Sequence, residues 1–443
     1  RNFNSYNQPS VNINNFVVFR GRSKGGETGQ PAHGVYSRDM AEEGVVPIFD
    51  RKTAVPQPNN LGSMFIEPPA FPRLDIYTNT MASRANYQPV WNFFLADGVT
   101  KSRAGTTGIH VTLPDSYELV TGASNVAGAE GLNDFGFLIE PTSHVKFDVF
   151  PGAPAVSDGS TIVFKGNYTV GGVSKTGVYF RKLVNEKIPS NQGVGGAGDL
   201  SPAAGQNPVV VIANAGTPIP GTTGKVFGST APPSAANGRA VFAGFDNEDN
   251  PTAGGIYLAQ MMGPFPALEP LIQIGDPVPD VKGAYITRLG EGISFDGRFV
   301  AFWGAWGTET EAGWKTLILQ CPKDGNKGRQ AYCKSLYGDG TNAGTVSAGF
   351  KAKVPVNQGI FVIDLTKVKG KRLVARTPND FNDFVYWNFS GKVPAEFMTV
   401  GSGEGGSGEG GSGEAGEGGE GGEDDGEPAR WRSASFVAVS GQR

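Results

Sequence analysis

The residues of this sequence that could do chemistry are carboxylates and tryptophans, because histidine and cysteine are scarce. The chain of 443 residues contains three histidines, His33, His110 and His144, and two cysteines. Three histidines leave little room for a general base, and no Cys-His pair is visible. We therefore do not expect a serine or cysteine hydrolase.

Three acids stand close together in one expected hairpin loop, at Asp246, Glu248 and Asp249. Paired carboxylates can cleave glycosidic bonds without histidine. Several oxygens from one flexible loop can also bind a hard cation such as Ca²⁺. The alternative interpretation is an ordinary polar loop with solvated acids. The sequence thus predicts no cofactor other than Ca²⁺ at these three residues.

Tryptophans cluster around one expected strand and the loop that follows it, at Trp303, Trp306 and Trp314. Exposed indoles stack well on sugar rings. Trp303 ends an apolar strand, so packing between sheets accounts for it. We predict Trp306 and Trp314 as the side chains that stack on a ligand.

The two cysteines, Cys321 and Cys333, flank a segment with the Gly, Asn and Asp content of a hairpin tip. A disulfide across a hairpin is the prediction, and two reduced buried thiols are the alternative. Glycosylation sequons begin at Asn167 and Asn388. Together these features favour a secreted or cell-surface glycoprotein. The chain begins at Arg1 without a signal segment, which suggests a processed chain or a fragment.

The composition excludes several classes of protein. The 66 glycines and 31 prolines are too many helix breakers for a helical bundle, a coiled coil or a membrane-spanning bundle. No apolar run approaches the roughly 18 residues of a spanning helix, so membrane insertion is not expected. The net charge is −4, and residues 401–427 hold nine acids and no Lys or Arg. The remainder, at +5, lacks the dense positive stripe of a nucleic-acid binder.

Three landmarks recur in the same order along the chain, with a period of about 70 residues. The first is a turn and an apolar strand that ends in Gly, as in residues 157–166, 237–244 and 294–304, with weaker copies at 14–21 and 435–441. The second is Gly, a β-branched residue and usually an aromatic, beginning at Gly34, Gly108, Gly177, Gly255 and Gly359. The third closes the unit, at residues 53–56, 217–220 and 276–279. Asp158 and Asp296 are expected to cap tight turns, with positive φ at the glycine that follows.

A unit of this length predicts three or four short strands, which cannot bury both faces of their sheet alone. Radial stacking of such sheets buries those faces, which predicts an all-β chain folded as a propeller of about six blades with loop insertions. A two-sheet sandwich is the competing architecture. The expected blades are residues 1–60, 61–135, 136–222, 223–284, 285–380 and 381–443. The Gly/Glu-rich tract 401–427 is expected to be a solvated loop inside the last blade.

The pattern Ser-x-Asp-Gly-x-x-Val-Ala-Phe, followed by Gly-Val-Tyr, resembles the repeat of TolB-like (WD40-like) propellers. This resemblance implies the architecture and transfers no functional residue.

Two functions from different classes are compatible with these features. The first is a non-enzymatic extracellular module, structural or interaction-forming, which serves as a subunit of an extracellular assembly. Its sixth unit stops before a Gly-Val-Tyr strand, and the resulting open edge would accept a protein partner or a second copy by strand addition. The alternative is a propeller that binds or cleaves a glycan, marked by two carboxylates beside exposed aromatics in one pocket.

Overall fold

The computed structural model describes residues 3, 5–6, 8–23, 31–56, 62–94, 101–113, 118–125, 147–183, 209–248, 251–307, 314–319 and 350–377. The side chains of 88–94, 101–105, 314–319 and 350–354 are not described. All regular structure in these residues is β-strand, which confirms the all-β prediction. No helix long and apolar enough to cross a membrane occurs among them.

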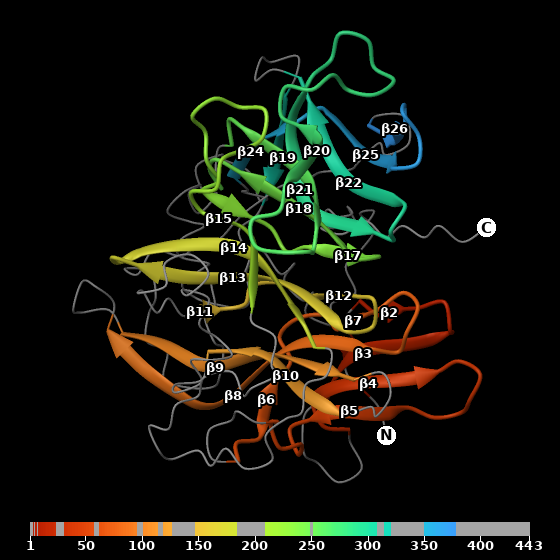
Figure 1. The fold of residues 1–443 in the computed structure, drawn as a ribbon, viewed down its shortest axis with the longest axis vertical. Coiled ribbons are helices and arrows are strands. Elements are labelled where there is room, and N and C mark those ends of the chain that lie inside the picture. The colour runs from red at the N-terminus through yellow and green to blue at the C-terminus, as the bar shows by residue number, and fades with distance from the viewer. Residues whose placement is uncertain are drawn as a thin grey trace.

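The strands form five antiparallel sheets that follow one another in chain order, from the red end of the chain to the blue (Figure 1). Sheet 1 contains β1 (Ser5–Tyr6), β2 (Ser10–Val11), β3 (Phe16–Arg22), β4 (Gly34–Asp39) and β5 (Val46–Asp50). Sheet 2 contains β6 (Phe65–Glu67), β7 (Arg73–Leu74), β8 (Met81–Phe94), β9 (Lys101–Thr112) and β10 (Leu119–Ser124). Sheet 3 contains β11 (Phe147–Val149), β12 (Ala155–Ser157), β13 (Thr161–Val170), β14 (Val173–Lys182) and β15 (Val210–Asn214).

The last two sheets repeat this plan. Sheet 4 contains β16 (Ser229–Thr230), β17 (Ser234–Ala236), β18 (Arg239–Phe245), β19 (Gly254–Gln260) and β20 (Leu268–Gln273). Sheet 5 contains β21 (Ile286–Phe295), β22 (Phe299–Trp306), β25 (Asn357–Asp364) and β26 (Lys371–Arg376). A separate ribbon, β23 (Trp314–Leu319) and β24 (Phe350–Pro355), lies in the chain between β22 and β25.

Every sheet has the same topology, a meander, and the segments of the first strands contact one another from sheet to sheet. In sheets 1 to 4 this first strand is broken in two, so that both β1 and β2, for example, pair with β3. In sheet 5 it is the single strand β21, whose register shifts between Leu289 and Ile293. The segments β2, β7, β12, β17 and β21 contact one another in series. Four apolar cores fill the four interfaces between consecutive sheets. This arrangement is propeller-like, because each sheet buries its faces against its neighbours.

The first two sequence landmarks lie on neighbouring strands and are paired in the same way in different sheets. The glycine that ends the first landmark pairs with the glycine that begins the second, as Gly166 with Gly177 and Gly244 with Gly255. A phenylalanine ring lies against this glycine, so that a Cβ on Gly244 would come 2.6 Å from Cε1 of Phe227. Phe227 also packs edge-on to Tyr257 of the second landmark. The recurring glycines therefore leave room for an aromatic ring.

The third landmark ends the meanders of sheets 1, 3 and 4 with the same hydrogen bond. The side chain of its first residue accepts the backbone N–H three residues earlier, at 3.0 Å for Thr53, 3.0 Å for Thr217 and 2.9 Å for Asp276. The residue after it forms an isolated bridge in all three copies, for example Pro218 with Val226. The three landmarks are therefore structural repeats. The blade boundaries and the TolB-like assignment stay predictions, and the expected unit 381–443 lies outside the described residues.

Candidate functional site

The turn that joins the first and second strands of sheet 5 is held by its own acidic side chain. Asp296 Oδ1 accepts the N–H of Arg298 at 2.9 Å and of Phe299 at 2.7 Å, which confirms its capping role. Asp158 and Gly159 both have positive φ, at 54° and 67°. Such turns are also bonded from sheet to sheet, since the N–H of Gly238 donates to Ser157 Oγ at 3.0 Å. These acids and hydroxyls are engaged in structure.

The loop acids predicted as a calcium or carboxylate site are not equivalent. Asp246 accepts backbone N–H bonds from Thr252 at 2.8 Å and Ala253 at 3.0 Å, and pairs with Lys225 at 2.9 Å. Burial opposes ionisation, but the hydrogen bonds from the Thr252 hydroxyl, from Lys225 and from the two backbone N–H groups hold the pKa of Asp246 well below its usual range. Its oxygens are therefore engaged inside the loop.

Glu248 stands in the same loop, and Asp249 lies outside the described residues. No group of three or more His, Cys, Asp or Glu that could hold a metal occurs in the described part of the chain. Calcium binding stays a prediction.

The predicted stacking role of Trp306 is wrong for this fold. Its side chain is only 4% exposed and packs edge-on to Phe361 at 6.0 Å in the core between sheets 4 and 5. Nearly all of β22 is buried, and Trp306 is its last residue. The position of Trp306 beside Gly307 in the sequence suggested an exposed loop instead. Trp314 lies in β23, and its side chain is not described.

The remaining predicted sites are placed only in part. Asn167 lies inside β13, opposite Thr176, and its Oδ1 is buried. Asn388, Cys321 and Cys333 lie outside the described residues. Glycosylation and the disulfide stay predictions.

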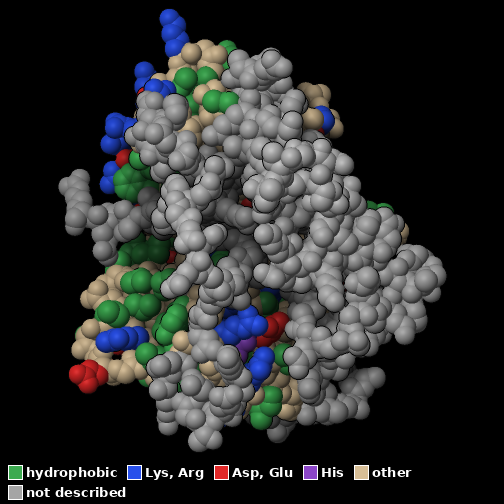
Figure 2. Space-filling model, turned by 180° about the vertical axis from the view of Figure 1, so that it is seen from behind, with side chains coloured by type: hydrophobic (Ala, Val, Ile, Leu, Met, Phe, Trp, Pro, Cys, Tyr) green, Lys and Arg blue, Asp and Glu red, His purple; other side chains and the backbone are tan. Residues whose placement is uncertain are grey.

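Two histidines are buried and kept neutral. Burial lowers the pKa of His110 to about 3. For His33, burial and the nearby charges of Arg20, Arg22 and Arg51 lower the pKa to about 3. One histidine is visible beside Lys or Arg and Asp or Glu side chains in Figure 2. A histidine with so low a pKa is a poor base at neutral pH.

Glu291, which the sequence reasoning missed, has the properties of a functional carboxyl. It lies in β21, in the Gly290-Glu291-Gly292 stretch where the register with β22 shifts. The indole of Trp303 lies against this stretch, because a Cβ on Gly290 would come 3.3 Å from its Cε3. Glu291 is half-buried, and its position in β21 matches the break in the first strand of the other four sheets.

Charged residues from two preceding sheets influence the ionisation of Glu291 through space. Burial raises the pKa of Glu291, the positive charge of Lys165 in sheet 3 opposes that rise, and the negative charge of Glu248 in sheet 4 adds to it. Lys165 is itself buried, at 7% exposure. A carboxyl that keeps its proton above the usual pH, within electrostatic reach of a second carboxyl, can donate that proton to a leaving group. We call Glu291, Glu248 and Lys165 the inner carboxylate site.

The sequence held one signal for Glu291: an acid between two glycines just before a repeat turn, where the other units have prolines or small residues. Its partners come from different sheets, so that no spacing rule could have joined them.

Comparisons with known proteins add little to this geometry. No protein-family model matches the chain, and no curated protein matches it. Among solved structures, a glycoside hydrolase of the GH130 mannoside phosphorylase family that targets β-1,2 mannosidic linkages in Candida mannan is 13% identical, with a TM-score of 0.26, over 68% of this chain and 81% of its own. The GH93 α-L-arabinofuranosidase of Fusarium graminearum is 13% identical, with a TM-score of 0.22, over 67% and 86%. The α-L-arabinanase of Penicillium chrysogenum is 11% identical, with a TM-score of 0.22, over 67% and 87%. We draw no functional conclusion from likenesses this weak.

Proposed function

We propose that this chain is a carbohydrate-active propeller that acts through the inner carboxylate site. The observation that carries the proposal is Glu291, a half-buried carboxyl of raised pKa on the first strand of its sheet. Perturbed carboxyls of this kind concentrate at functional sites. The sequence alternative of a glycan-binding or glycan-cleaving protein is therefore favoured over the non-enzymatic module.

The chemistry assigned to the site is glycoside cleavage with two carboxyls. Glu291 would protonate the glycosidic oxygen, because its raised pKa keeps the proton on the acid. Glu248 would serve as the second carboxyl, acting on the sugar or on water. Lys165 would balance the negative charge that forms when Glu291 gives up its proton.

The test compares Glu291→Gln and Glu248→Gln with the matched control Glu269→Gln, an exposed acid on β20. The assays are reducing-end release from a panel of polysaccharides and binding to a glycan array. We expect both site variants to lose sugar release by about 10²-fold or more, while the control keeps it. If the wild type binds glycans without cleaving them, the chain is a lectin, and Glu291→Gln should then bind glycans more weakly. A wild-type chain that neither cleaves nor binds any glycan would refute the proposal.

A second candidate function is the extracellular interaction module, without enzymatic activity. It is favoured by apolar side chains left exposed on sheet 1, where Tyr6 and Val46 are each 62% exposed. The partner would be a protein or a second copy of this chain, and the module would be a secreted, disulfide-bonded glycoprotein. Native mass spectrometry of the intact chain tests it: a monomer at every concentration would remove self-association, and the mass would show whether glycans are attached.

A further inference from the structure

The hairpin between β25 and β26 carries an unusual density of positive charge. Five cations occur within ten residues: Lys367, Lys369, Lys371, Arg372 and Arg376. The first four are exposed. Together with Arg298, which directly precedes β22, they form what we call the basic face of sheet 5. A surface of one sign attracts a polymer of the other.

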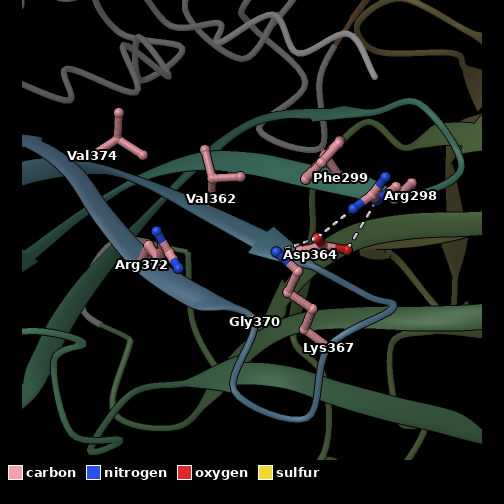
Figure 3. Close-up of a pocket in the computed structure, with 8 residues that line it drawn as sticks. All are labelled: Arg298, Phe299, Val362, Asp364, Lys367, Gly370, Arg372 and Val374. Carbon is pink, nitrogen blue, oxygen red and sulfur yellow. Dashed lines mark hydrogen bonds and ion pairs between the residues drawn. The ribbon is translucent and has the colours of Figure 1, made fainter. Parts of the chain in front are cut away.

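A pocket of about 240 Å³ opens on this face. Phe299 and Val362 supply apolar wall, and Asp364 is its single acidic side chain (Figure 3). Asp364 accepts two hydrogen bonds from Arg298, at 3.1 and 2.8 Å, and lies 3.6 Å from Lys367 Nζ. One carboxylate therefore faces two cations, and positive charge is left over.

Arg372 adds to that excess. It lines the same pocket from the neighbouring strand β26 and takes part in none of the contacts drawn in Figure 3. Outside the pocket, Lys371 Nζ lies 4.0 Å from Asp276, a distance at the limit of an ion pair. The face therefore suits an extended ligand with several carboxylates better than a single small anion.

We propose that the occupant of the basic face is the acidic tract of the same chain, residues 401–427. The tract has nine acids and no Lys or Arg, which complements the face in sign and supplies more than one carboxylate for each of its five cations. Residues 378–400 join it to the last described residue of sheet 5, a connection that can span up to about 80 Å when extended. A tether of this length gives an effective concentration on the order of millimolar, which an external acidic partner would have to exceed.

The contact is electrostatic and adaptable. Exposed ion pairs contribute only about 0–1 kcal/mol each, so that several must act together. Fixing each glycine of the tract in one conformation would cost roughly 1–2 kcal/mol, which favours a tract that binds as a charged polymer in many arrangements. Added salt should release it.

The test uses the full-length chain and a labelled synthetic peptide with the sequence of residues 401–427. One variant has the nine acids of the tract changed to glutamine. A second adds Lys369→Glu and Arg372→Glu to that background, and its matched control adds Lys282→Glu, an exposed lysine between sheets 4 and 5. Binding is followed by fluorescence anisotropy at low salt and at about 0.5 M NaCl.

We expect the peptide to bind the glutamine variant at least about tenfold more tightly than the wild type, whose own tract competes. Lys369→Glu with Arg372→Glu should abolish that binding, Lys282→Glu should not, and high salt should remove it. Equal binding to wild type and glutamine variant would overturn the proposal and leave the face for an external acidic partner. Absence of binding to both, or equal effects of the two charge reversals, would overturn it as well.

Discussion

Replacing His110 with phenylalanine should stabilise the protein, and the gain should grow as the pH falls. His110 takes the position that holds Tyr36, Tyr179, Tyr257 or Phe361 in the other sheets. It is fully buried, 4.8 Å from the ring of Phe65 and 5.7 Å from that of Tyr87. Neither of its ring nitrogens has a hydrogen-bond partner among the described residues. The imidazole is therefore a polar group in an aromatic core.

Two effects set the size of the change. Removing a buried polar group without a partner gains about 1–3 kcal/mol at any pH. The second effect depends on pH, because burial lowers the pKa of His110 from 6.5 to about 3 in the folded chain. A depressed histidine pKa gives stability that is full above pH 6.5 and lost as the pH falls toward 3. At pH 5 that loss amounts to about 2 kcal/mol relative to pH 7.5.

The assay is urea unfolding of wild type and His110→Phe at the two pH values. The difference between the proteins in free energy of unfolding should be about 2 kcal/mol larger at pH 5 than at pH 7.5. His33 titrates in both proteins, so its contribution cancels from this difference. A difference that is the same at both pH values would refute the assignment of a buried neutral imidazole. A variant less stable than wild type at pH 7.5 would refute the packing argument.

Two further predictions follow from the glycines and from Glu291. Gly244→Ala should lower the free energy of unfolding by about 1–3 kcal/mol, because its Cβ would come 2.6 Å from Phe227. Gly263→Ala, with nothing within 4 Å of its Cβ, is the control; equal urea midpoints would contradict this reasoning. In the wild type, the raised pKa of Glu291 means that stability present below the ordinary glutamate pKa is lost as the pH rises through the folded value. Glu291→Gln should remove that loss in pH-dependent unfolding, and an unchanged profile would show that Glu291 is not buried as described.

Most of the repeat could be predicted from the sequence, because its signals are local. Asn237-Gly238 and Asp158-Gly159 form tight turns in short stretches of chain, and both members of each pair have positive φ. The paired glycines of adjacent strands are likewise predictable from each unit alone, because an aromatic ring of the same unit packs against them. The count of six units stays a prediction, since the sixth lies outside the described residues.

The candidate site was predicted only in part. Glu248 was singled out, but as a loop acid with Asp246 and Asp249. The structure instead uses Asp246 to hold its own loop through Thr252 and Lys225. The negative charge of Glu248 raises the pKa of Glu291, which belongs to the next sheet.

The sequence by itself determined where strands and turns form and the order in which they recur. Backbone preferences and neighbouring side chains decide these features within a few residues. Tertiary structure alone decided which side chains lose contact with water. It buried Trp306 against Phe361 and brought Lys165 and Glu248, from two other sheets, within electrostatic reach of Glu291. The physical reason is that burial and charge act through space, and distance in space between sheets is not encoded in distance along the chain.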